Sequence, residues 1–229
     1  MGRMTAAANP APQPTPSPPA DWAAETEARV LAEALALVPK EGWTWAMTRA
    51  AGAAAGLSLG ETELLLPNGP KDLAALYSRQ CDAAGLAALA GTDPTALKVR
   101  ERIRRGALAR IAAAMEHEAA TRRLCGFLAL PANASLGLRL VWECADGIWR
   151  WAGDRATDEN HYTKRALLAG ILASTLLVRL AEGEAVAEAH LDRRIENVMA
   201  FERLKGRLGR LHLGRWTAGA LGRLRYGGF

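Results

Sequence analysis

The chain has 229 residues, a formal net charge of +5 and 50% hydrophobic residues, which suits one domain with a core of its own. Alanine and leucine dominate and only 6% of the residues are aromatic, so the composition favours an all-α fold over a β-rich one. Cys81, Cys125 and Cys144 are odd in number and have no CxxC spacing, which fits small buried thiols in a reducing compartment better than disulfides or a zinc site. The longest apolar run is about 13 residues, against roughly 20 for a membrane span.

The composition changes along the chain and predicts four parts. Residues 1–20 contain six prolines and no apolar run of the secretory type, which predicts a disordered leader. Residues 21–74 are expected to form a helix-turn-helix-like subdomain and residues 75–203 a larger helical body. Residues 204–229 are expected to be a basic, amphipathic, membrane-binding tail.

The first helix is predicted to begin at an Asp21 N-cap and to stop at Pro39. Two short helices should follow around a glycine-containing turn, the first capped by Thr44 and the second, residues 59–66, capped by Ser58. Trp43 and Trp45 are expected in the interior of this unit. Its expected apolar stripe on the first helix consists of Trp22, Val30, Ala34 and Leu37.

Longer helical patterns fill the rest of the chain. Pro70 opens one helix, and further helices are predicted over residues 94–121, 136–151, 162–181 and 185–208. We therefore expect nine to ten helices, an amphipathic helix at the C-terminal end, and no strand.

The charge of the helix-turn-helix argues against nucleic acid as a partner. Between residues 39 and 72, three cations face four anions, and the would-be recognition helix carries Glu61 and Glu63 followed by three leucines. DNA readers need Lys and Arg for phosphates and polar side chains for base edges. A transcriptional regulator that binds DNA remains the alternative hypothesis.

Residues 151–165, WAGDRATDENHYTKR, contain the densest set of ionisable side chains. The spacing of Asp154, Asp158 and His161 would place them on one helix face, as in a metal-dependent enzyme, but no second motif completes a ligand set and His117 is the only other histidine candidate. The alternative is a turn that Gly153 introduces, with Asp side chains bonding backbone amides and Lys164 and Arg165 as countercharges. We predict no catalytic residue, no metal and no cofactor.

The C-terminal tail is predicted to contact a membrane that contains anionic lipid. From residue 201 to 229 there are seven Lys or Arg and one acidic residue, and leucines recur at helical spacing beside the basic side chains. This pattern is typical of an interfacial amphipathic helix. The predicted membrane-binding residues are Leu204, Arg207, Leu208, Leu211 and Trp216.

Several motifs resemble the Coq-nine family of ubiquinone biosynthesis. These are the segment DGIWRWAGDRATDENHYTKRALLAGILASTLL, the HLDRRIENVM helix start, FLALP, and the helix-turn-helix with AGLSLG and its following Lys-Asp-Leu. The resemblance covers about residues 25–205. It implies a TetR-like fold, a homodimer, no DNA binding, and a non-enzymatic protein that holds an isoprenoid quinone intermediate or a phospholipid. The implied partner is the demethoxyubiquinone hydroxylase.

The resemblance also implies site residues. Carried over by position, the hydroxylase would contact Val141, Trp142, His161 and Tyr162; the animal proteins have Trp where this chain has His161. The pocket-lining candidates for the lipid are Met115, Leu138, Trp149, Ile171 and Leu172. We expect the protein on the cytoplasmic side of a bacterial inner membrane, or on the matrix side of the mitochondrial membrane if the source is eukaryotic.

Overall fold

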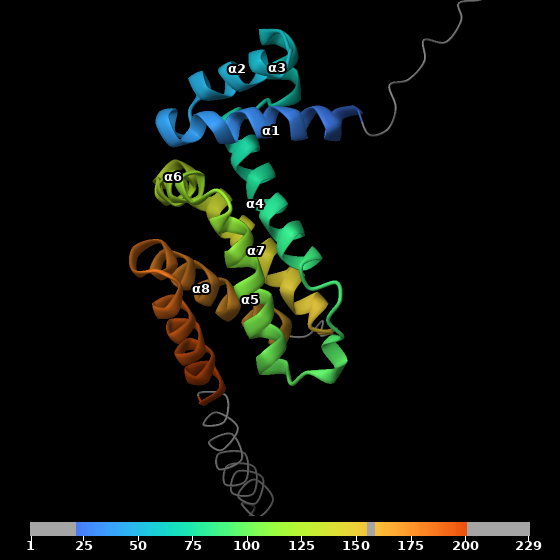
Figure 1. The fold of residues 1–229 in the computed structure, drawn as a ribbon, viewed down its shortest axis with the longest axis vertical. Coiled ribbons are helices and arrows are strands. Elements are labelled where there is room, and N and C mark those ends of the chain that lie inside the picture. The colour runs from blue at the N-terminus through green and yellow to red at the C-terminus, as the bar shows by residue number, and fades with distance from the viewer. Residues whose placement is uncertain (1–21, 155–158, 201–229) are drawn as a thin grey trace, which may run out of the picture.

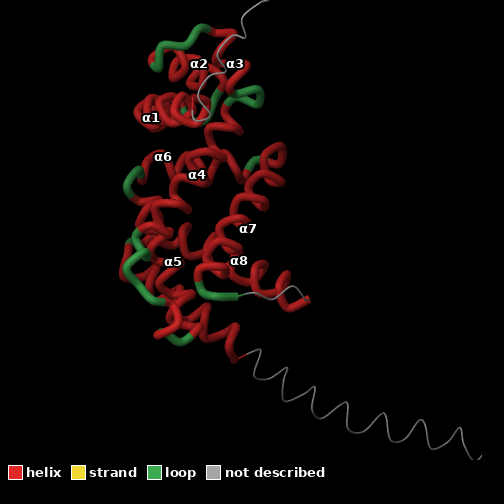
Figure 2. The backbone as a smooth tube through the Cα atoms, turned by 90° about the vertical axis from the view of Figure 1, so that its right-hand side faces the viewer, coloured by secondary structure: helices red, strands yellow, loops and turns green. Residues whose placement is uncertain are grey.

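A computed structural model describes residues 22–154 and 159–200, and within those residues all regular structure is helical (Figures 1 and 2). The predicted all-α fold is confirmed. The helices with complete bounds are α1 Trp22–Glu41, α2 Trp45–Ala54, α3 Leu59–Leu65, α4 Pro70–Ala87, α5 Val99–Met115, α6 Glu118–Ala129, α7 Ala134–Trp151 and α8 Glu159–Glu182. One further helix occupies residues 184–200.

The helix-turn-helix lies at one end of an elongated molecule, and helix 184–200 lies at the other (Figures 1 and 2). Both predicted caps are confirmed: the Thr44 hydroxyl accepts from the Met47 amide at 3.1 Å, and Ser58 forms a capping box with Glu61. α1 does not stop at Pro39 but continues to Glu41. The last turn tolerates Pro39 because the Gly42 amide still closes it by donating to the Val38 carbonyl at 2.8 Å.

The two tryptophans of this unit have different environments. Trp43 is 5% exposed and donates from Nε1 to the Ala120 carbonyl at 3.4 Å. Trp45 is 43% exposed, so its predicted burial is wrong. Its ring packs beside the backbone of Gly69, where a Cβ would lie 2.6 Å from it, and the Arg49 guanidinium lies 5.9 Å from the ring centroid.

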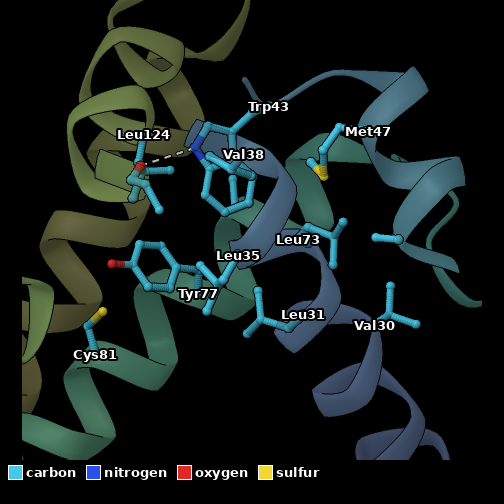
Figure 3. Close-up of a cluster of buried hydrophobic side chains, with 14 of the residues drawn as sticks. Val30, Leu31, Leu35, Val38, Trp43, Met47, Leu73, Tyr77, Cys81 and Leu124 are labelled. Carbon is cyan, nitrogen blue, oxygen red and sulfur yellow. Dashed lines mark hydrogen bonds between the residues drawn. The ribbon is translucent and has the colours of Figure 1, made fainter. Parts of the chain in front are cut away.

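The helix α4 joins the helix-turn-helix to the body. It contributes Leu73 and Tyr77 to the core that α1, Trp43 and α6 complete (Figure 3). Farther along, α4 packs on α5 and α7. Gly85 permits the α4–α5 crossing, because a Cβ there would lie 2.9 Å from the Arg110 Cα.

The single helix predicted over residues 94–121 is wrong. The structure divides this stretch into a 3-10 turn, Pro94–Ala96, followed by α5 and α6. Extended backbone at Leu97 and Lys98 causes the first break. At the second, the buried Thr121 hydroxyl donates to the Ala114 carbonyl at 2.6 Å and secures the turn between α5 and α6.

Charged pairs hold helix 184–200 against α5. Arg104 contacts Glu188 at 2.9 Å and Asp192 at 2.7 Å, and Arg100 contacts Glu196 at 2.9 Å. The predicted extension of this helix to residue 208 lies outside the described residues. In the described part of the chain no single helix is long and apolar enough to cross a bilayer, and only the pair Glu118–Ala129 and Pro131–Trp151, bent by 97°, would be by length and composition.

Candidate functional site

A largely apolar groove of about 440 Å³ lies in the body and is formed by α4, α5, α6, α7 and α8. This volume falls within the usual range for small-molecule sites. Exposed Leu138 and Leu177 lie at its edge, and Leu140 and Leu172 form buried parts of its wall. The other residues that line this apolar groove are Ser78, Arg110, Leu124, Cys125, Leu128, Ala129, Ala134, Gly137, Val141, Cys144, Ala173 and Leu176.

Few polar atoms face the apolar groove. Arg110 is its one charged lining residue among those that the structure describes, and this side chain is paired with Asp82 and lies 3.4 Å from the Ser78 hydroxyl and carbonyl oxygens. Burial raises the pKa of the Cys144 thiol to about 12 and also raises that of the Cys125 thiol. Both thiols are therefore protonated and uncharged at pH 7.

The structure does not bring the five predicted lipid-binding residues into one cavity. Leu138 and Leu172 line the apolar groove. Trp149 and Ile171 line a different hollow of about 250 Å³ between α5, α7, α8 and helix 184–200. Met115 lines a third, of about 390 Å³, beside α8 and helix 184–200. Helical periodicity placed these apolar residues on inward faces of their helices. It could not show that the faces line three separate cavities.

Trp142, His161 and Tyr162 form a second feature, which we call the aromatic corner. The Trp142 and Tyr162 ring centroids lie 6.1 Å apart, and the His161 ring meets Tyr162 edge to face at 5.2 Å. Tyr162 lies in the first turn of α8 and is 65% exposed. Val141, the fourth predicted partner residue, is half-buried and lines the apolar groove instead.

A buried arginine fixes the helix junction beneath the aromatic corner. The Arg165 side chain is 2% exposed and contacts Asp146 of α7 at 2.5 Å and Asp154 of the turn at 3.1 Å. It also donates to the His161 carbonyl at 3.2 Å, so the same guanidinium joins α7, the turn and the first turn of α8. The sequence analysis identified Arg165 only as a countercharge, because periodicity does not reveal that a cation is buried.

Asp154, which the sequence offered as a metal ligand, pairs with two cations of the protein instead. Burial opposes ionisation of Asp154, but hydrogen bonds from Lys164 at 2.8 Å and from Arg165 outweigh it and lower the pKa of the carboxyl. Gly153, at φ +87°, ends α7 as predicted. Among the described residues no group of three His, Cys, Asp or Glu side chains is placed to hold a metal ion. Asp158 lies outside the described residues, and His117 is exposed.

The outer helix of the helix-turn-helix presents acids and leucines. Leu64 is 84% exposed and Leu59 56% exposed, and Arg49 is paired with Glu63 at 3.2 Å. A DNA phosphate backbone that approached this helix would meet the carboxylates of Glu61 and Glu63 and few free cations. Its charge would therefore be repelled. The predicted membrane-binding residues, from Leu204 to Trp216, and the leader 1–20 lie outside the described residues.

Comparison with known proteins finds its family match in the part of the chain that contains the aromatic corner. The sequence model of the COQ9 family matches residues 134–202, which include α7, α8 and the aromatic corner. The chain is 30% identical to "Ubiquinone biosynthesis protein COQ9, mitochondrial" of Rattus norvegicus over 183 residues, 75% of this chain and 58% of that protein. The chain is a COQ9 relative. The resemblance to the Coq-nine family that the sequence motifs indicated is thereby confirmed.

Other COQ9 proteins match over a similar extent. The chain is 30% identical to COQ9-B of Xenopus laevis, over 77% of this chain and 64% of that protein. It is 27% identical to COQ9 of Homo sapiens, over 75% of this chain and 57% of that protein. The chain thus spans less than two thirds of the length of these COQ9 relatives. A TetR transcriptional regulator from Rhodococcus sp. RHA1 superposes with a TM-score of 0.57 at 14% identity, over 76% of this chain and 95% of that one. The TetR-like fold is therefore confirmed.

Proposed function

We propose that this COQ9 relative is a non-enzymatic accessory protein of ubiquinone biosynthesis. It holds an isoprenoid quinone intermediate in the apolar groove and presents it to the demethoxyubiquinone hydroxylase at the membrane. The observation that carries the proposal is the match of residues 134–202 to COQ9, because this segment supplies much of the groove wall and the whole aromatic corner. The names of the matched relatives place them in ubiquinone biosynthesis.

The groove suits the tail of such a ligand. Apart from Ser78 and Arg110, its walls are apolar side chains, small residues and protonated thiols, and burial of an isoprenoid chain against them removes apolar surface from water. Leucines at the open edge, 71% exposed at Leu138 and 56% at Leu177, would be covered by an occupant. A phospholipid with the same apolar requirement is the other candidate occupant.

A variant that fills the groove tests this part of the proposal. Ala173 lines the groove on α8, and Ala173→Trp would occupy part of its volume; Ala181→Trp, exposed on the same helix, is the matched control. Native mass spectrometry and lipid extraction of the purified proteins should show a quinone or phospholipid with the wild type and the control, and a large loss with Ala173→Trp. Equal retention by all three proteins would refute the groove as the site.

The aromatic corner suits a protein partner. Exposed Tyr beside Trp is the kind of pair that dominates interface energies. Tyr162→Ala should abolish binding to the hydroxylase in a pull-down or by surface plasmon resonance, while Leu64→Ala, at the opposite end of the molecule, should leave binding unchanged. Unchanged affinity of a folded Tyr162→Ala protein would contradict the assignment.

We propose in addition that residues 204–229 bind anionic membrane and that the protein is a homodimer. The membrane would be the bacterial inner membrane from the cytoplasmic side, or the mitochondrial inner membrane from the matrix side. The six basic residues of this tail and its leucine spacing support the first of these proposals. Deletion of residues 203–229 should remove sedimentation with liposomes that contain anionic lipid, and light scattering after size exclusion should give twice the monomer mass.

A further inference from the structure

The ion pair between Arg110 and Asp82 has a consequence for the ligand. Arg110, on α5, lines the apolar groove, whereas Asp82, on α4, does not line it but lines a separate small hollow that Arg110 also lines. The two side chains are only 13% and 17% exposed. A buried cation beside an apolar groove would ordinarily attract a carboxylate or phosphate head, but here the protein already provides the anion.

Few other charges near the groove alter this balance. The two lining thiols are protonated at pH 7, and the remaining described lining residues are apolar, apart from the Ser78 hydroxyl. An ionised head entering the groove would lose its hydration and find a guanidinium that is already neutralised, which is costly. An uncharged head with carbonyl, hydroxyl or ether oxygens would lose much less and could still accept a hydrogen bond from the Arg110 guanidinium or from Ser78.

We propose that the Arg110–Asp82 pair makes the apolar groove selective for amphiphiles whose polar head is uncharged, and against those with a carboxylate or phosphate head. This inference rests on the proposed function of the groove and adds a rule for which ligands it accepts. The uncharged ring of a prenylated quinone satisfies the rule and the head of a fatty acid does not, so of the two candidate occupants named above the rule favours the quinone over the phospholipid. Asp82 acts as a specificity residue although it does not line the groove.

Two ligands that differ only in the head group test the rule. Geranylgeraniol is uncharged and geranylgeranoic acid is ionised at pH 8, and both have the same isoprenoid tail. Equilibrium dialysis against the full-length protein should give a Kd for the alcohol about tenfold or more below that for the acid, because burial of the charge is not compensated. Asp82→Asn leaves the Arg110 cation without its anion, so the preference should shift toward the acid by about tenfold or more.

Two further variants complete the design. Glu101→Gln removes the anion of the exposed Arg105–Glu101 pair on α5, the helix that carries Arg110, and should leave the preference unchanged. The double variant Asp82→Asn with Arg110→Met removes both charges and should restore the preference for the alcohol. Neither of these two variants leaves a buried cation without its anion, whereas Asp82→Asn does. A merely structural effect of the change at residue 82 would persist in the double variant and would not restore the preference for the alcohol.

The outcomes separate the two proposals. If the wild type binds neither ligand, the groove is not an isoprenoid site, and this inference fails with the proposed function. If the wild type binds the alcohol and the acid with equal affinity, or prefers the acid, selectivity is refuted while isoprenoid binding stands. If Asp82→Asn does not fold, the wild-type comparison and the double variant still decide the matter.

Discussion

Replacement of Arg165 by Met tests whether the buried junction stabilises the fold. Removal of one partner from a buried ion pair costs about 3–5 kcal/mol, because the remaining charge is left uncompensated. Here Asp154 would keep Lys164 at 2.8 Å and Asp146 would keep Arg150 at 2.7 Å. We therefore expect the lower end of the range, a loss of about 3 kcal/mol in the free energy of unfolding.

The measurement is urea unfolding followed by circular dichroism, with Arg105→Met as the control. Arg105 forms an exposed i,i+4 pair with Glu101 on α5, with side chains 45% and 40% exposed, so its loss should change stability by less than about 1 kcal/mol. Equal small losses in both variants would refute the reasoning, because they would mean that burial of Arg165 adds nothing to its pairing.

The same variant has a pH signature. The folded-state pKa of Asp154 is lowered, so its contribution to stability is present above the ordinary Asp pKa of about 3.9 and is lost as the pH falls through the folded-state value. The difference in stability between the wild type and Arg165→Met should therefore be full at pH 7 and should shrink below about pH 4. A difference that stays constant down to pH 3 would assign the effect of Arg165 to packing alone.

Three further predictions concern backbone and helix contacts. Gly85→Ala should destabilise the protein by about 1–3 kcal/mol in urea unfolding, because its Cβ would meet the α5 backbone, whereas Gly60→Ala, with nothing within 4 Å on exposed α3, should be neutral or stabilising. Gly153→Ala should lower stability by about 1–2 kcal/mol in the same assay because φ is +87°, and an unchanged midpoint would mean that the turn can relax. Arg104→Met should increase amide hydrogen exchange in residues 184–200 more than in α4, since it removes the contacts with Glu188 and Asp192; equal protection in the variant would show that apolar contacts alone hold the helix.

Much of the local structure could be predicted from the sequence because its signals are local. Thr44 and Ser58 capped the helices expected of them, and Gly153 ended α7 where its conformational freedom is required. Local signals also explain the main error in the fold, since residues 94–121 carry a continuous helical pattern while Leu97, Lys98 and the turn before Glu118 interrupt it.

The sites were predicted less completely, because they depend on contacts between distant residues. The aromatic corner was located through the family resemblance, and the structure places Trp142 and Tyr162 together although nineteen residues of sequence separate them. The division of the apolar candidates among three hollows depends on how α5, α7 and α8 cross. The pairing of Arg110 with Asp82 joins two helices, and nothing in the spacing of the sequence indicates it.

The position of α7 has a consequence for how the two proposed sites would act together. Val141 and Trp142 are consecutive residues of this helix, and the first lines the apolar groove while the second belongs to the aromatic corner. An occupant that displaces α7 from one side would alter the surface on the other side. Thermodynamic reciprocity then requires that a hydroxylase bound at the corner change the affinity for the lipid by the same factor by which the lipid changes the affinity for the hydroxylase. The helix would thus couple the affinity for the lipid to docking of the hydroxylase.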